Sequence, residues 1–215
     1  VERVFVTPGN GGIAQENRRN VQAMDLDGII RLAHTEYIDL VIVGPEAPLV
    51  GGLVDRLEAA GVRAFGPTAA AARLEGSKSW MKSFCVENAI PTAAWRYADT
   101  YRKAADIIPV WQHMNHGIPP VIKADGLCGG KGAVVPKTLE EALAAARTML
   151  RGDAPFGEAG RIIVIEDRLI GHECSVMALC AHLDYRLLPL SRDHKRAHSG
   201  DTGPNTGGMG GYSPL

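Results

Sequence analysis

The first 75 residues alternate between short apolar runs and stretches in which apolar residues recur at helical spacing. The runs Val4–Val6, Leu40–Val43 and Val62–Phe65 end close to glycine and proline, which is typical of buried strands. Between them, residues 25–37 and 49–60 carry apolar side chains on one helical face. This β-α-β-α-β order predicts an α/β domain with a doubly wound parallel sheet, in which ligands bind at the carboxyl ends of the strands.

The pattern changes in the second half of the chain. Residues 77–88 have helical spacing and precede Ile90 and Pro91, where we place a boundary. Short strand-like runs with glycine-rich connections then predict an α+β domain with a small antiparallel sheet. The predicted strands are Val121–Lys123, Ala133–Val135, Ile162–Glu166, Ser175–Leu179 and Leu187–Leu190.

Two segments of this half have a helical pattern, and one pattern is clearer than the other. Thr138 precedes Glu141 at the spacing of a capping box, so a helix is predicted to begin there and to end at Gly152. Residues 98–116 are also helical in pattern, but Pro109 interrupts them, which predicts a kinked helix or two short ones.

Composition narrows the classes of function. The net charge of −1 provides no long-range attraction to nucleic acid or to an anionic membrane, so neither is expected as a partner. The four cysteines show no CxxC pair and no zinc-ribbon spacing, which favours reduced thiols in a cytoplasmic protein. No apolar stretch is long enough to span a bilayer. A small anionic substrate stays compatible with this composition, because it needs only a local cluster of cations and N–H groups.

The strongest chemical signal is the glycine-rich segment 121–135, which reads VIKADGLCGGKGAVV. It places Lys123 and Lys131 beside glycines whose backbone N–H groups can turn toward a phosphate. The spacing is not that of a Walker A motif, since Gly132 stands where a serine or threonine would bind magnesium. The segment predicts a triphosphate site held by a strand–loop–strand; a mobile hairpin with solvated lysines is the alternative.

Residues Glu166, Leu169 and Glu173 give a weaker signal at the end of a predicted strand. They would supply carboxylates and an apolar side chain to an adenosine. An exposed acidic strand end is the simpler interpretation of this segment on its own.

The polar segment 191–211 combines a dense cluster of charges with small residues and glycines. This combination favours an anion or amino-acid site over a solvated linker. His194 and His198 have the spacing of a metal site on a helix, but the glycines that follow argue against that helix.

Five motifs occur along the chain in order. They read GPEAPL at 44–49, FGPT at 65–68, LEGSK at 74–78, KADG with GKG at 123–132, and DHKR followed by GDTGPNTGGMG at 193–210. In sequence and order they resemble the phosphoribosylamine–glycine ligase family, and they cover nearly the whole chain.

The resemblance implies an ATP-grasp fold, with ATP between two lobes, and a reaction of de novo purine biosynthesis. Glycine carboxylate would attack the γ-phosphate of ATP, giving glycyl phosphate and ADP, and the amine of 5-phosphoribosylamine would then displace phosphate to give glycinamide ribonucleotide. The implied cofactors are ATP and Mg²⁺. The implied divisions are an incomplete pre-ATP-grasp domain over 1–75, a linker and the start of the ATP-grasp domain over 76–120, its small lobe over 121–190, and the truncated start of its large lobe over 191–215.

The resemblance also implies roles for individual residues. The nucleotide would be bound by Lys78, Lys123, Gly126, Gly129, Gly130, Lys131, Gly132, Glu166, Leu169 and Glu173. The catalytic residues would be Lys123, Asp193, Lys195 and Arg196. The substrates glycine and 5-phosphoribosylamine would contact Gly9, Asn10, Pro45, Glu46, Asp201, Asn205, Thr206, Gly207 and Gly208.

The sequence departs from the family pattern at both ends. The family's glycine-rich loop would precede Val1 and its acidic, magnesium-holding strand would follow Leu215, so we expect the metal ligands outside this sequence and a longer or multifunctional chain. Two alternatives are a noncatalytic nucleotide-binding fragment and another ATP-grasp carboxylate–amine ligase. Segment 193–210 argues against the second, because other such ligases share the nucleotide lobe but not this substrate segment. A structural protein would not explain why polar, glycine-rich segments recur at strand ends.

Overall fold

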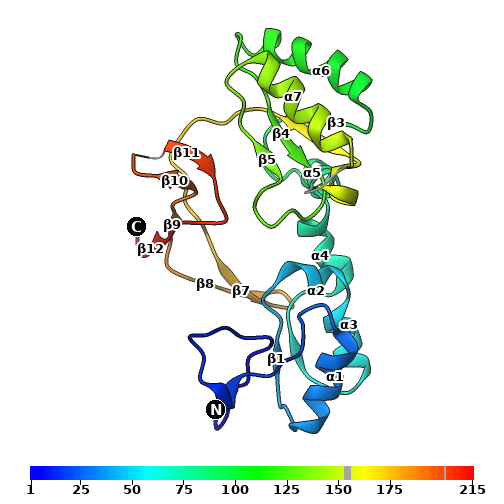
Figure 1. Cartoon of the computed structure of the whole chain (residues 1–215), viewed down its shortest axis with the longest axis vertical. Coiled ribbons are helices and arrows are strands. Elements are labelled where there is room, and N and C mark those ends of the chain that lie inside the picture. The colour runs from blue at the N-terminus through cyan, green and yellow to red at the C-terminus, as the bar shows by residue number, and fades with distance from the viewer. Residues whose placement is uncertain (153–155, 201) are drawn as a thin grey trace. The chain divides into compact units, whose positions relative to one another are not determined.

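The computed structural model describes residues 1–152, 156–200 and 202–215, and for Pro204 and Asn205 the backbone alone. Two compact units divide the chain, Val1–Asn88 and Ala89–Leu215 (Figure 1). Each unit has its own hydrophobic core, as expected of separate folding units. Within the described residues, no helix is both long and apolar enough to cross a lipid bilayer.

The first unit contains a parallel pair of strands, β1 (Val41–Ile42) and β2 (Ala64–Phe65). Its helices are α1 (Leu26–Thr35), α2 (Glu46–Val50), α3 (Leu53–Ala59), α4 (Ala69–Gly76) and α5 (Lys78–Glu87). Its core consists of Ile29, Ala33, Val43, Leu53, Val54, Leu57 and Val62. The predicted α/β arrangement with parallel strands is confirmed, and β1 and β2 are the one parallel pair of strands among the described residues.

The predicted strand Val4–Val6 is wrong in extent. Only Val6 pairs, in an isolated parallel bridge with Arg18. Its N–H and carbonyl groups bond to Asn17 and Arg19 (2.8 and 3.0 Å), in the chain that returns after a short 3₁₀ turn at Gln15–Asn17. Residues 4–6 therefore close the base of the loop that runs from Val6 to Arg18, and they do not extend the parallel sheet.

The single helix predicted over 49–60 is also wrong. The structure has two helices there, α2 and α3, because Gly51 and Gly52 interrupt the backbone between them. Helix α4 was not predicted, although Thr68 caps it by accepting a hydrogen bond from the N–H of Ala71 (3.4 Å).

The second unit is built on an antiparallel sheet with the strand order β3-β6-β4-β5. The strands are β3 (Trp95–Ala98), β6 (Ile163–Glu166), β4 (Val121–Ala124) and β5 (Ala133–Val134). Helices α6 (Tyr101–Met114) and α7 (Leu139–Leu150) pack together over one face (Figure 1). The core between them includes the fully buried side chains of Ile108, Ile122, Met149, Ile163 and Ile165. Burying one such side chain stabilises the fold by about 1.5–3 kcal/mol, and the predicted small antiparallel sheet is confirmed.

The two helices of this core were predicted with different success. The predicted start of α7 is confirmed, since Thr138 caps it by accepting from the N–H of Glu141 (3.1 Å). The Glu141 carboxylate reaches back one residue beyond the N-cap, to the N–H of Lys137 (2.7 Å), so the second bond differs from that of a standard capping box. Helix α6 is one continuous helix that contains Pro109, so of the two predicted forms the pair of short helices is wrong. Buried Ile108 before the proline and the packed ring of Trp111 after it hold both sides of α6 on the same core.

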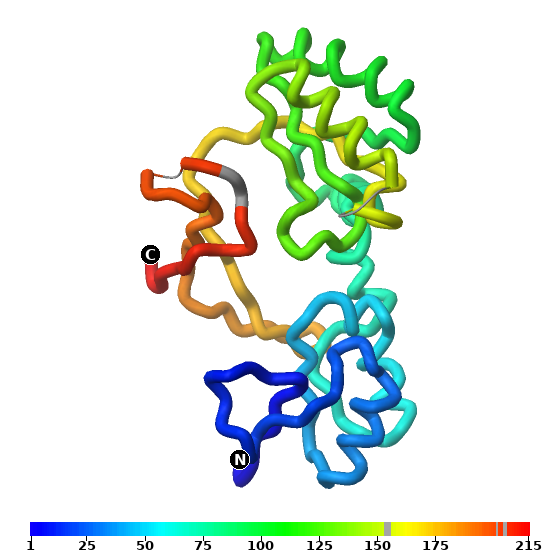
Figure 2. Tube along the Cα trace, in the orientation of Figure 1, coloured from blue at the N-terminus to red at the C-terminus, as the bar shows by residue number. Residues whose placement is uncertain are grey.

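The remainder of the second unit is a series of short antiparallel pairings along the orange-to-red part of the tube in Figure 2. A 3₁₀ turn at Gly157–Gly160 precedes β6. Strands β7 (Ala178–Ala181) and β8 (Asp184–Leu187) form a hairpin, and Ser175 pairs with Ser191 in an isolated bridge. The predicted strands at Ser175–Leu179 and Leu187–Leu190 are thus displaced toward the turn, where the hairpin closes.

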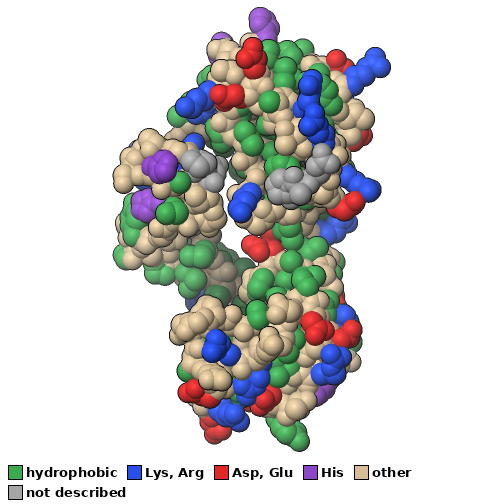
Figure 3. All heavy atoms as spheres, in the orientation of Figure 1, with side chains coloured by type: hydrophobic (Ala, Val, Ile, Leu, Met, Phe, Trp, Pro, Cys, Tyr) green, Lys and Arg blue, Asp and Glu red, His purple; other side chains and the backbone are tan. Residues whose placement is uncertain are grey.

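The polar segment 191–211 is extended, so the prediction that His194 and His198 do not lie on a helix is confirmed. Strand β9 (Arg192–Asp193) pairs with β12 (Gly211–Tyr212), and β10 (Arg196–His198) pairs with β11 (Thr202–Asn205). Hydrophobic side chains are visible on the surface of this part of the unit in Figure 3, and Leu179, Tyr185 and Leu187 of the preceding hairpin are exposed. Hydrophobic packing therefore stabilises this region far less than it stabilises the four-stranded sheet.

Candidate nucleotide and substrate site

Lys123 and Glu166 lie on the sheet face opposite α6 and α7. Lys123 pairs with Val164 in register, and Glu166 lies two residues further along β6 on the same face. The Nζ atom of Lys123 forms an ion pair with Oε1 of Glu166. The glutamate side chain is 6% exposed and the lysine side chain 31%, so a buried carboxylate orients a partly accessible ammonium group. The sequence indicated both residues but not their contact.

The loop between β4 and β5, residues 125–132, is anchored at its base and open at its tip. Asp125 and Gly126 donate their N–H groups to carbonyl groups of the chain that precedes β6 (2.9 and 3.1 Å). At the tip, the N–H groups of Gly129 and Gly130 donate to no acceptor within the described part of the chain. Glycine N–H groups of this kind are available to phosphate oxygens.

Gly130 brings this loop against the polar tail. Its φ of +77° lies in the left-handed region, which favours glycine. A Cβ atom at Gly130 would lie 3.3 Å from the Cα of Gly207 and 3.8 Å from the carbonyl oxygen of Thr206. Two segments that are far apart in the sequence, and were both predicted to belong to the site, therefore meet through their backbones.

Hydrogen bonds order the charged cluster of the tail. The Lys195 ammonium group lies 3.0 Å from a carboxylate oxygen of Asp193, and this hydrogen bond holds the pKa of Asp193 below its usual range. The Arg196 guanidinium donates to a backbone carbonyl of β11 (2.8 Å). Thr206 donates its N–H and its hydroxyl to the carbonyl of Lys195 (2.7 and 3.0 Å) and accepts from the N–H of Gly208 (3.0 Å). The tail thus presents an ionised carboxylate paired with Lys195, and a second cation, Arg196, held on the neighbouring strand.

The predicted residues of the first unit lie in loops and at helix starts. Pro45 and Glu46 begin α2 directly after β1, and Lys78 is the first residue of α5. Gly9 and Asn10 lie in the loop that follows the bridge at Val6. Pro45 and Glu46 therefore occupy the carboxyl end of a parallel strand, where the sequence predicted a ligand.

The predicted adenosine-binding residues do not share one environment. Leu169 and Glu173 are exposed on the segment between β6 and β7, whereas Glu166 is buried. Asp201 lies outside the described residues.

The magnesium ion that the resemblance implies has no ligand set in the described ranges. Among those residues, no group of three or more His, Cys, Asp or Glu side chains is arranged to hold a metal ion. The carboxylate of Glu166, on the sheet that carries the predicted phosphate loop, is engaged with Lys123.

Sequence reasoning did not single out Arg18, which lies against the loop that contains Gly9. Nη1 of Arg18 donates to the carbonyl oxygen of Asn10 at 3.4 Å, and its carbon chain packs at Gly9. The available signal was a pair of arginines, Arg18 and Arg19, a few residues after a glycine-rich segment. A surface pair of solvated charges is the usual interpretation of such a doublet.

Solved structures define the class of fold. N5-carboxyaminoimidazole ribonucleotide synthetase from Thermus thermophilus superimposes with a TM-score of 0.60 at 20% identity, over 90% of this chain and 48% of that chain. At this identity the likeness shows the fold alone. The fold is that of the ATP-grasp ligases.

The family follows from closer matches. Residues 1–75 match the family described as "Phosphoribosylglycinamide synthetase, N domain", and residues 76–215 match "Phosphoribosylglycinamide synthetase, ATP-grasp (A) domain". The chain belongs to the phosphoribosylglycinamide synthetase family.

Individual relatives agree with this assignment. A phosphoribosylamine–glycine ligase from Xylella fastidiosa (strain Temecula1) is 51% identical over 218 residues, covering 100% of this chain and 49% of that protein. The crystal structure of phosphoribosylamine–glycine ligase from Thermotoga maritima has a TM-score of 0.78 at 32% identity, over 99% of this chain and 50% of that chain. The chain spans about half the length of the curated relatives it matches.

Proposed function

We propose that the complete protein to which this sequence belongs joins glycine to 5-phosphoribosylamine with ATP. The products are glycinamide ribonucleotide, ADP and phosphate, formed through glycyl phosphate in de novo purine biosynthesis. The observation that carries the proposal is the approach of Gly130 to Gly207, because it joins the nucleotide loop and the substrate segment within one unit. Membership of the family and the names of the relatives support the same activity.

In this proposal the second unit binds the triphosphate. Lys123, oriented by Glu166, neutralises phosphate charge from the sheet, and the open N–H groups of Gly129 and Gly130 cover the phosphates from the loop. Further contacts to the nucleotide are assigned to Lys78, Gly126, Lys131, Gly132, Leu169 and Glu173. Positioning and charge neutralisation are what phosphoryl transfer requires of a protein.

In this proposal the tail, residues 191–211, binds glycine, which is the acyl donor, and 5-phosphoribosylamine, which is the acyl acceptor. Lys195 and Arg196 neutralise the glycine carboxylate, whose oxygen attacks the γ-phosphorus while the bond to ADP breaks. The amine of 5-phosphoribosylamine then attacks the carbonyl carbon, the bond to phosphate breaks, and the amine loses a proton. Asp193 is ionised at neutral pH and can accept a hydrogen bond from an amino group. Further substrate contacts are assigned to Gly9, Asn10, Pro45, Glu46, Asp201, Asn205, Thr206, Gly207 and Gly208.

The test is ADP release by the complete protein with Mg-ATP, glycine and 5-phosphoribosylamine, with each component omitted in turn. We expect release that requires all of them and yields glycinamide ribonucleotide by mass spectrometry. Release supported by another amino acid in place of glycine would overturn the substrate assignment. ATP binding without any release would favour a noncatalytic nucleotide-binding protein.

A further inference from the structure

Arg18 has more hydrogen-bond donors than the protein supplies with acceptors. A guanidinium group carries five N–H donors. Arg18 uses one of them, from Nη1, on the carbonyl of Asn10 at the long distance of 3.4 Å. Its Nε is buried without a partner, and no carboxylate of the described residues pairs with it. The buried Nε without an acceptor costs free energy, and the half-buried guanidinium keeps donors that an external anion can reach.

The loop beside Arg18 also has unused donors. The N–H groups of Gly9, Asn10 and Gly11 donate to no acceptor within the described ranges, whereas the N–H of Gly12 is bonded to the Asn10 side chain (2.9 Å). Space at Gly11 is open, since a Cβ there would meet no atom within 4 Å. Successive free N–H groups in a turn are a recurrent anion-binding arrangement.

Gly9 fixes the loop on the arginine. Its φ of +74° favours glycine, and a Cβ at this position would lie 2.9 Å from Cγ and 3.2 Å from Cδ of Arg18. Gly9 therefore packs against the aliphatic stem of Arg18, so the loop with the free N–H groups and the guanidinium are neighbours.

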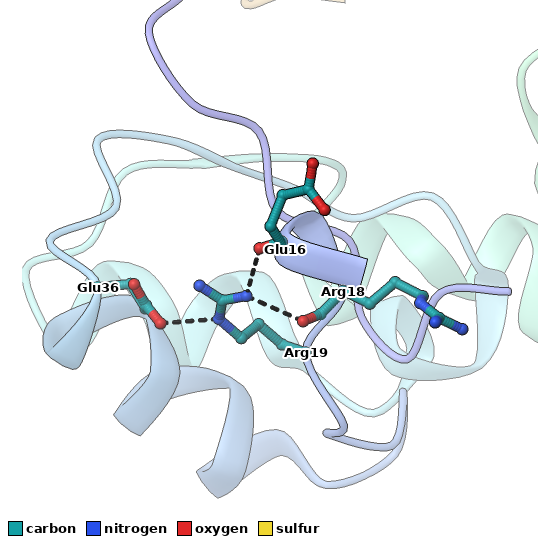
Figure 4. Close-up of polar contacts among 4 residues, drawn as sticks. All are labelled: Glu16, Arg18, Arg19 and Glu36. Atoms are coloured by element: carbon teal, nitrogen blue, oxygen red, sulfur yellow. Dashed lines mark hydrogen bonds and ion pairs between the residues drawn. The ribbon is translucent and has the colours of Figure 1, made fainter. Parts of the chain in front are cut away.

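The neighbouring Arg19 shows what a purely structural arginine looks like in this loop. Its Nε lies 2.7 Å from the Glu36 carboxylate, and Nη1 donates to the carbonyls of Glu16 and Arg18 (2.7 and 2.9 Å). Its guanidinium also lies 4.0 Å from the centre of the Phe5 ring. Figure 4 shows the Arg18 side chain extending away from this cluster. Arg19 fastens the loop to α1, and Arg18 is left for another partner.

We propose that Arg18 and the free N–H groups of Gly9–Gly11 form a binding site for a phosphate monoester. The ligand we assign is the 5-phosphate of the sugar substrate, and this assignment rests on the proposed function. A phosphate monoester carries nearly two negative charges and three strong acceptor oxygens. A planar guanidinium fork with adjacent N–H groups satisfies these oxygens better than it would the two oxygens of a carboxylate.

The experiment measures binding of ribose 5-phosphate, inorganic phosphate and glycine to the 215-residue chain by calorimetry and by amide chemical shifts. We expect ribose 5-phosphate to bind most tightly and to shift the amides of Gly9–Gly11. Arg18→Gln should weaken this binding at least about tenfold, as expected for loss of a charged hydrogen bond, and Arg18→Lys less. Arg31→Gln is the matched control, because Arg31 is an exposed arginine of α1 that carries the same charge.

Three results would overturn the site: equal binding by Arg18→Gln and the parent, shifts confined to other amides, or inorganic phosphate binding as tightly as ribose 5-phosphate. Thermal unfolding of each variant identifies loss of folding. Arg18→Lys, which keeps the stem and the charge, tests the site even where Arg18→Gln unfolds the loop. The assay contains no ATP, so its failure removes the Arg18 site without touching the ligase proposal. Absence of ADP release from the complete protein removes the ligase proposal and the sugar-substrate assignment, while ribose 5-phosphate binding at Arg18 would stand on its own.

Discussion

The second unit contains two lysine–carboxylate pairs with the same chemistry in opposite surroundings. Lys123 and Glu166 project from adjacent strands of the four-stranded sheet, where the glutamate is 6% exposed. Lys195 and Asp193 lie in the tail, where the side chains are 51% and 39% exposed. Breaking a buried pair costs about 3–5 kcal/mol, whereas an exposed pair contributes about 0–1 kcal/mol. The sheet pair is therefore fixed by the fold, and the tail pair can exchange its partner for a substrate group at little cost.

The backbone around each pair shows the same contrast. All four residues of β6 are buried, and all four residues of the β7 strand are exposed. The sheet is held by a continuous core, while the later hairpins depend mainly on their own hydrogen bonds. Rigid geometry and adjustable geometry thus occur within one unit.

The largest effect should come from opening a cavity under the sheet. Ile165→Ala removes a fully buried side chain and should lower the free energy of unfolding by about 2–5 kcal/mol. The matched change Leu187→Ala, at a side chain that is 63% exposed, should cost less than about 0.5 kcal/mol. Urea denaturation of both variants measures this difference, and equal losses would contradict the contrast between sheet and hairpin.

Loss of the sheet lysine should weaken nucleotide binding. Lys123→Ala removes a charged hydrogen bond to phosphate worth about 1.5–3 kcal/mol, so the Kd for ATP should rise about 10- to 150-fold. Calorimetric titration measures it, with Lys137→Ala as the control because Lys137 is an exposed lysine of the same unit. Unchanged affinity in the Lys123 variant would refute its role.

Loss of Glu166, the partner of Lys123, should lower the stability of the second unit as well as its affinity for ATP. Glu166→Ala leaves Lys123 facing a buried strand end and should destabilise the second unit by about 1–3 kcal/mol, less than a fully buried pair because the lysine is partly exposed. Glu166→Gln keeps the volume and an acceptor and should cost less. Thermal unfolding of both variants decides the matter; a Gln variant as unstable as the Ala variant would show that charge, not packing, dominates.

The smallest effect is expected for the tail pair. The pKa of Asp193 is lowered mainly by its hydrogen bond from Lys195. A lowered folded-state pKa means that the contribution is complete above the ordinary aspartate pKa and is lost as the pH falls through the folded value. Asp193→Asn should change stability at neutral pH by less than about 1 kcal/mol. In an NMR titration, Lys195→Gln should raise the pKa of Asp193 toward its usual range, and an unchanged pKa would exclude Lys195 as the cause.

The parts of the fold that the sequence predicted are those with strong local signals. Strands β4 and β6 are short β-branched runs that each contain one charged residue, and α7 begins at a threonine N-cap, so their positions follow from a few adjacent residues. The local pattern left open whether Pro109 divides residues 98–116 into two helices, and the packing of Ile108 on the core keeps α6 continuous through the proline. Local sequence rules therefore do not determine the structure where packing on the hydrophobic core outweighs them.

The candidate site divides along the same line. The glycine-rich loop and the charged tail were visible as motifs, because phosphate and carboxylate chemistry restricts residue types. The approach of Gly130 to Gly207 and the pairing of Lys123 with Glu166 were not predicted, since both depend on how separate segments meet in space. Arg18 was missed for a related reason: its unused donors become apparent only when its neighbours are known.

The contact between Gly130 and Gly207 couples the position of the phosphate loop to that of the polar tail. It involves backbone atoms alone and no charged side chain. Mechanical coupling of this kind is not screened by salt and does not titrate, unlike the ion pairs on either side of it. A methyl group at Gly130 would push Gly207 back by a few tenths of an ångström and strain the left-handed backbone, at every pH and ionic strength.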